Sequence, residues 1–194
     1  MDILRLVNNA HGLSKEFRPQ HLMQDSFSKV WLCREVFWAV RSINYTLCKL
    51  GLEQVVIISG YRSYTYQEKL FMRKIDHLRK QGLEDEMAKI KAAQIVAMPG
   101  HSEHQLGLAV DLAVWSMKDL EDPLTTDFDQ TDTGKWLLQN SPRYGLILRY
   151  PKDKVAITQI TYEPWHYRYV GQKAAQKMHE NHWCLEEYLC ALKG

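Results

Sequence analysis

The sequence lacks the features that mark secreted and membrane proteins. Its first nine residues contain neither a basic start followed by a long apolar run nor a small-residue cleavage site, so no signal peptide is predicted. No later stretch stays apolar for the about 20 residues that a membrane-spanning helix needs. We therefore expect no membrane anchor and a cytoplasmic protein.

Cysteine is scarce, and its spacing excludes the common paired motifs. The four cysteines, Cys33, Cys48, Cys184 and Cys190, show no CxxC pattern. Cys33 and Cys48 fall on one predicted helix, which separates them by about 22 Å, too far for a disulfide. This usage is typical of a reducing cytoplasm. We interpret the cysteines as small buried hydrophobic residues.

An excess of charge of one sign is also missing. The chain has 25 lysines and arginines against 23 acidic residues, and the two signs are interspersed. No field strong enough to collect nucleic acid or anionic lipid follows from this balance, so neither partner is expected. With 194 residues, 45% of them hydrophobic, the chain is expected to form a single domain over residues 1–194.

Hydrophobic periodicity predicts a mixture of helices and strands. Helices are expected over residues 28–50, 64–81, 84–97 and 135–139 and from 171 to the C-terminus, and strands over 55–58, 108–114, 146–150 and 165–170. The stretch 101–105 carries too many polar groups to be core, and is expected to be a loop or a strand edge. Strands in the middle with helices at both ends predict an α+β fold with a small, largely antiparallel sheet flanked by helices.

An acid interrupts the apolar strand predicted over residues 108–114. Asp111 is costly to bury there unless it is paired or bound to a cation. His104 precedes it by an odd separation, which would place the two on opposite faces of one strand, but Gly107 between them supplies a break. Imidazole and carboxylate groups are suitable ligands for zinc.

A second unusual segment is Glu163-Pro164-Trp165-His166. The proline excludes a regular helix, so a turn must bring Glu163 and His166 to one side. This arrangement suits a metal ligand and a general base that share one activated water. Arg62, on the turn after the strand 55–58, is a candidate to stabilise an oxyanion.

Spacing alone leaves alternatives open. His101 lies beside His104, and His179 with His182 makes an equally suitable pair on the last predicted helix. That pair also fits a solvated helix face, because no buried acid accompanies it. Arg62 fits a structural ion pair as well as a catalytic role, and Trp165 fits a plain core aromatic.

Two motifs resemble the signatures of the LAS metallopeptidases. Residues 102–111, SEHQLGLAVD, match SxHxxGxAxD, and residues 163–166, EPWH, match ExxH. The turn SGYRS at 59–63, with Gln67 downstream, resembles the substrate turn of the VanY carboxypeptidase branch, and residues 168–171 extend the match. Within this group the chain resembles the cytoplasmic VanXY enzymes, which combine D-Ala-D-Ala dipeptidase with D,D-carboxypeptidase activity in glycopeptide resistance.

This resemblance implies the LAS fold, one zinc ion and a set of site residues. The zinc would be held by His104, Asp111 and His166, with Glu163 as the general base and Arg62 as the transition-state contact. Matching substrate positions are Ser59, Gln67, Ser102 and Trp165. The implied reaction is hydrolysis of the terminal D-Ala-D-Ala bond, in the free dipeptide, in a nucleotide-linked muramyl pentapeptide, or in both. Removal of that terminus would deprive vancomycin of its target.

One departure bears on the substrate. Ser59 stands where the dipeptidase branch is expected to carry an aspartate that binds the ammonium of a dipeptide, so we expect a preference for the pentapeptide. An L,D-carboxypeptidase of tetrapeptides and a metal-stabilised binding module without catalysis are the alternatives. Glu163 argues against the binding module, because a structural zinc site is normally closed by four protein ligands and needs no base. Oligomeric state does not follow from the sequence.

Overall fold

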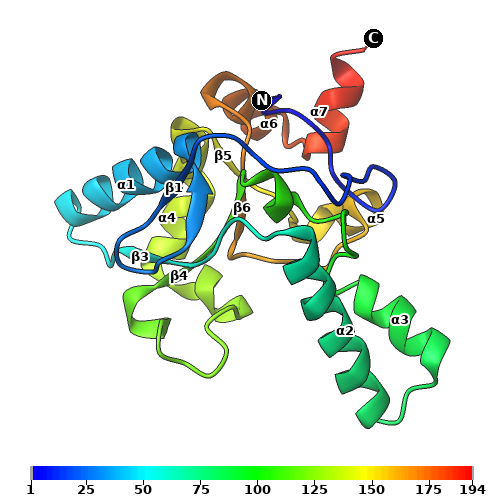
Figure 1. Cartoon of the computed structure of the whole chain (residues 1–194). Coiled ribbons are helices and arrows are strands. Elements are labelled where there is room, and N and C mark those ends of the chain that lie inside the picture. Colours follow the sequence, from blue (N-terminus) through cyan, green and yellow to red (C-terminus); the bar gives the residue numbers. More distant parts are fainter. Residues whose placement is uncertain (1, 194) are drawn as a thin grey trace.

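A four-stranded antiparallel sheet forms the centre of the protein in this computed structural model, which describes residues 2–193 (Figure 1). Its strand order is β3-β4-β6-β5, from strands β3 (Val55–Ser59), β4 (Ala109–Val114), β6 (His166–Tyr169) and β5 (Leu146–Leu148). A separate hairpin pairs β1 (Leu22–Gln24) with β2 (Trp31–Cys33). The predicted α+β fold with a small antiparallel sheet is confirmed.

Helices surround this sheet. The α-helices are α1 (Arg34–Lys49), α2 (Tyr64–Lys80), α3 (Asp85–Ala93), α4 (Asp132–Asn140), α5 (Val155–Thr158), α6 (Gln172–Asn181) and α7 (Leu185–Ala191). Short 3-10 helices are η1 (Glu103–Leu106), η2 (Trp115–Met117), η3 (Thr126–Gln130), η4 (Ser141–Tyr144) and η5 (Lys152–Lys154). Helices α2 and α3 pack side by side and project from the body (Figure 1). Among residues 2–193, no helix has the length and apolar character needed to cross a membrane.

Helix α1 begins later than its sequence pattern predicts. The predicted start at residue 28 is wrong, because Trp31–Cys33 pairs with β1 and the helix begins only at Arg34. From there its buried side chains lie three, four, seven and eleven residues after the first, as on one face of a helix, at Val36, Ala39, Val40, Ile43 and Leu47. Burying each large aliphatic side chain of this face stabilises the fold by about 1.5 to 3 kcal/mol.

Strand β4 lies inside the sheet and is buried along its whole length. Its apolar residues pack into the main core, and its neighbours β3 and β6 satisfy its backbone on both edges. An acid on this strand therefore lies in the interior, with its surroundings set by the two flanking strands.

Three other predictions differ from the structure. The stretch 101–105 is not an exposed loop, because Glu103, His104 and Gln105 are 1%, 2% and 0% exposed and begin the helix η1. The helix expected over 84–97 ends at Ala93. The C-terminal helical region is divided into α6 and α7 at His182, which adopts a left-handed backbone with φ 54°.

Candidate active site

Strand pairing brings three predicted site residues to one place in the sheet. Asp111 on β4 lies opposite His166 on β6, and a register shift between Ile57 and Ser59 places Ser59 opposite Asp111 on the other side. Asp111 is buried, with its Oδ1 3.0 Å from Nδ1 of His166. The pairing explains how residues 55 positions apart in the sequence share one site.

His104 reaches the same site from helix η1. The helix ends at Gly107, whose φ of 71° is a left-handed conformation that favours glycine, and the chain then turns into β4. His104 Nε2 lies 3.2 Å from Asp111 Oδ2. Its Nδ1 lies 2.7 Å from the carbonyl oxygen of Gly60, which requires Nδ1 to donate and leaves the Nε2 lone pair for a metal.

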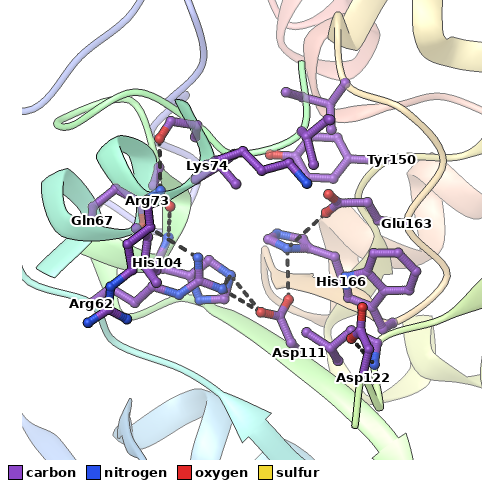
Figure 2. Close-up of a pocket in the computed structure, with 18 of the residues that line it drawn as sticks. Arg62, Gln67, Arg73, Lys74, His104, Asp111, Asp122, Tyr150, Glu163 and His166 are labelled. Atoms are coloured by element: carbon purple, nitrogen blue, oxygen red, sulfur yellow. Dashed lines mark hydrogen bonds and ion pairs between the residues drawn. The ribbon is translucent and has the colours of Figure 1, made fainter. Parts of the chain in front are cut away.

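The turn at 163–166 places Glu163 beside the same imidazole pair. The His166 backbone N–H donates to the Glu163 carbonyl at 3.1 Å, which closes the turn that the proline was expected to enforce. Glu163 Oε2 lies 3.6 Å from His166 Nδ1. Figure 2 shows both side chains at one wall of a cleft, with Asp111 below them and His104 opposite. The acid is therefore adjacent to the histidine without being hydrogen-bonded to it.

These side chains fit a metal ion. His104, Asp111 and His166 are buried and offer one ligand atom each, and the three atoms lie within 4.8 Å of one another. Asp111 Oδ1 has no hydrogen-bond partner, although it is buried. Two imidazoles and one carboxylate are a donor set that zinc accepts. Within residues 2–193 this is the one group of three or more such residues, and His179 and His182 lie outside it and are exposed.

Burial and the neighbouring charges shift the pKa values of the site. Burial, together with Arg62, lowers the pKa of His104 to about 4. Burial also disfavours the charged form of His166, but its contact with Asp111 outweighs this effect and raises its pKa to about 9. Burial raises the pKa of Glu163 to about 7, in spite of His166 nearby. A carboxyl group that titrates near neutrality can both accept and return a proton.

Arg62 lies at the centre of a hydrogen-bond network at the start of α2. Its Nη2 donates to Asp111 Oδ2 at 2.6 Å and lies 3.0 Å from His104 Nε2. Its Nε donates to the Ser59 hydroxyl at 2.8 Å, and its Nη1 lies 3.4 Å from the Gln67 side-chain oxygen. Ser59 thus holds the guanidinium that points into the site.

The site opens into a cleft of about 530 Å³. Of the four predicted substrate contacts, Gln67, Ser102 and Trp165 line this cleft, whereas Ser59 lies behind Arg62. Gln67 is held by a hydrogen bond of 2.8 Å from its amide nitrogen to the carbonyl of Ala97. Residues of α2 and of the turn at 163–166 therefore both line the cleft.

A buried group of ion pairs behind the site was missed by the sequence analysis. Glu103 accepts from Arg149 at 2.9 Å and lies 2.8 Å from Arg168, and all three side chains are fully buried. Glu103 Oε2 lies 3.9 Å from His166 Nε2, on the ring edge that faces away from Asp111. The sequence offered one signal, the position of Glu103 next to His104. That signal was too weak to predict a buried ion pair, because an acid beside a histidine is common on protein surfaces.

Comparison with known proteins identifies the family of this chain. Residues 29–172 match the family VanY, D-alanyl-D-alanine carboxypeptidase. The chain is 37% identical to the bifunctional D-Ala-D-Ala dipeptidase and D-Ala-D-Ala carboxypeptidase VanXYC of Enterococcus gallinarum, over 97% of this chain and 94% of that protein.

Solved structures show the same fold. The D,D-pentapeptidase VanY from a VanB-type vancomycin resistance cassette, in complex with Zn(II), has a TM-score of 0.83 at 34% identity, covering 97% of this chain and 99% of that one. VanYB in complex with D-alanine-D-alanine has a TM-score of 0.83 at 34% identity, covering 96% and 97%. The LD-carboxypeptidase LdcB has a TM-score of 0.82 at 36% identity, covering 96% and 85%. Together with the family match, these likenesses show that the chain belongs to the VanY family of D-alanyl-D-alanine carboxypeptidases.

Proposed function

We propose that this protein is a zinc-dependent D,D-carboxypeptidase that hydrolyses the terminal D-Ala-D-Ala bond of peptidoglycan precursors. The observation that carries the proposal is the buried trio His104, Asp111 and His166 with Glu163 beside it in one cleft. A related VanY binds Zn(II), and a related VanYB binds D-alanine-D-alanine. The proposed cofactor is one zinc ion held by the trio.

The chain's own residues divide the reaction between them. When bound, zinc would polarise the scissile carbonyl and make water more acidic. Glu163 takes a proton from the attacking water and passes it to the nitrogen of the leaving D-alanine as the C–N bond breaks. Arg62 donates hydrogen bonds to the oxygen that becomes negative in the transition state. Ser59 and Gln67 hold the Arg62 side chain.

The pKa of Glu163 supports its assigned role. Burial raises this pKa to about 7, so a substantial fraction of the group is ionised at neutral pH and can accept a proton. Arg62 and the cation of the cofactor both favour the ionised form. The base form is therefore available at neutral pH, and the protonated acid that follows is strong enough to return its proton.

The proposed substrate is the pentapeptide terminus, free or linked to a nucleotide carrier, with the free dipeptide as a second substrate. Removing the terminal D-alanine would eliminate the target of vancomycin, and we propose a contribution to resistance on this basis. The LdcB likeness favours one alternative, an L,D-carboxypeptidase that acts on tetrapeptides.

A parallel assay tests the proposal. Zinc-loaded protein is incubated with D-Ala-D-Ala, with a pentapeptide ending in D-Ala-D-Ala and with the corresponding tetrapeptide, and released D-alanine is quantified. We expect the wild type to cleave the pentapeptide. Glu163→Gln should reduce the rate of this cleavage by about 10²- to 10⁴-fold while zinc stays bound. Cleavage of the tetrapeptide alone would establish the L,D-carboxypeptidase. A wild-type protein that cleaves none of the three would contradict the proposal.

A further inference from the structure

The outer part of the cleft carries positive charge that the proposed reaction does not use. Leu70, Arg73, Lys74 and His77 line the cleft and belong to α2. Their spacing of three, four and seven residues places them on one face of that helix. Figure 2 shows Lys74 extended into the cleft, with Arg73 beside Gln67. One helix face therefore presents two permanent cations to the space in which a substrate must lie.

These two cations are not neutralised by the protein. Among residues 2–193, no ion pair includes Arg73 or Lys74, whereas Asp76, Asp85 and Glu86 pair with Arg79 and Lys89. His77 differs, because its ring nitrogen contacts the Gln81 side chain at 3.0 Å. Arg73 and Lys74 are thus the cations of this wall that are available to a ligand.

The position of the cations relates them to one part of the substrate. Gln67 marks the inner end of α2, since it contacts Arg62, which contacts Asp111. Arg73 and Lys74 follow six and seven residues later, which is about 9 to 10.5 Å along the helix axis. The leaving D-alanine is a single residue and spans at most about 3.6 Å beyond the scissile bond. The helix positions that carry the two cations therefore lie farther from the inner end of α2 than the leaving D-alanine extends, which favours the acyl part of the substrate as their partner.

We propose that Arg73 and Lys74 form a subsite for an anionic group on the acyl part of the substrate. This inference rests on the proposed function and names the chemical class of its preferred substrate. Arginine binds carboxylate and phosphate with two parallel hydrogen bonds, and lysine adds a point charge. The anion comes from one of two sources, a free carboxylate of an acidic residue in the peptide or the diphosphate of a nucleotide carrier.

The test compares substrates that differ only in this charge. Two pentapeptides end in the same D-Ala-D-Ala, and the glutamate three residues before the scissile bond has a free α-carboxylate in one and a carboxamide in the other. A nucleotide-linked version of the carboxamide peptide supplies the diphosphate alone. The proteins are wild type, the double variant Arg73→Gln/Lys74→Gln and the matched control Lys69→Gln/Lys80→Gln, which removes two exposed charges of α2 from outside the cleft lining.

We expect the wild type to favour one anionic substrate over the neutral peptide by roughly tenfold in kcat/KM, as a charged hydrogen bond in a partly exposed site provides. The double variant should lose this preference but keep its rate on the neutral peptide, and the control should behave as wild type. A preference for the carboxylate peptide identifies an acidic residue as the source, and a preference for the nucleotide-linked peptide identifies the diphosphate. Binding of the released tetrapeptide, measured by calorimetry, should follow the same order.

Two results would overturn the subsite while leaving the proposed function intact. One is equal kcat/KM for charged and neutral peptides in wild type. The other is an equal loss on all peptides in the double variant, which would assign Arg73 and Lys74 to the terminal carboxylate that all of them share. Failure of wild type to cleave any of the peptides would instead contradict the proposed function and the subsite with it.

Discussion

The candidate metal centre predicts a zinc-dependent stability that depends on three residues. A ligand that binds only the native protein at 100 times its Kd raises the free energy of unfolding by about 2.7 kcal/mol. In a chain of this length, each kcal/mol raises Tm by about 2 to 4 °C, so zinc should raise Tm by about 5 to 11 °C. Of the three proposed ligands, Asp111 is the one that contacts both imidazoles, at 3.0 and 3.2 Å. Asp111→Ala should therefore abolish most of this rise.

Differential scanning calorimetry of each protein with and without zinc measures this effect. The comparison within one protein separates zinc binding from any change in intrinsic stability that the substitution causes. His104→Ala and His166→Ala should also lose the rise, and Asp111→Asn tests the carboxylate with little change of shape. His179→Ala and His182→Ala are matched controls, because they remove the two exposed histidines that the sequence pattern offered as an alternative pair.

The assignment has a clear contrary outcome. If Asp111→Ala kept the full zinc-induced rise in Tm while His179→Ala lost it, the metal would bind at the end of α6 and not in the cleft. Direct metal analysis of the same samples at matched free zinc would confirm which site is occupied.

Three further predictions follow from the surroundings of the site. The pKa of His166 is about 9, so zinc must displace a proton from this side chain below that pH. Calorimetry should therefore show the apparent zinc affinity rising about tenfold per pH unit between pH 7 and 9. An affinity that does not change with pH would contradict this prediction. Arg149 and Arg168 outweigh burial and hold the pKa of Glu103 below its usual range, so Glu103 stabilises the fold above about pH 4.5 and less as pH falls below it. In urea unfolding, Glu103→Gln should lower the free energy of unfolding by about 3 to 5 kcal/mol at pH 7. The free energy of unfolding of this variant should also change less between pH 7 and acid pH than that of wild type. Ser59→Ala removes an acceptor of Arg62 and should lower kcat about tenfold with little change in KM, whereas an unchanged kcat would exclude this positioning role.

Much of the site could be predicted because its signals are local. Asp111 is an acid within an apolar run, and the structure places it on a strand that is buried from end to end. Gly107 was expected to break the chain between His104 and Asp111, and it does so with a left-handed backbone. Each of these features depends on a few adjacent residues, so it can be predicted from the sequence pattern.

Other parts depend on contacts between distant segments and could not be predicted. The stretch 101–105 is polar, yet Glu103 is buried, because Arg149, just after β5, and Arg168, in β6, reach it from more than 40 residues later in the chain. The late start of α1 has a similar cause, since Trp31–Cys33 is taken by pairing with β1. Burial of a polar residue and the choice between strand and helix are both decided here by partners that hydrophobic periodicity does not reveal.

The role of Ser59 shows how the two kinds of information combine. The sequence places Ser59 at the end of a strand and just before Arg62, which suggests a side chain that meets the substrate. Strand pairing sets Ser59 opposite Asp111, and its hydroxyl accepts from Arg62 at 2.8 Å. Among residues 2–193, Asp111 is the acid that forms an ion pair with Arg62, and a neutral acceptor at position 59 adds no second one. The serine therefore leaves more of the guanidinium available to the reacting carbonyl than an acid would, as the proposed carboxypeptidase reaction requires.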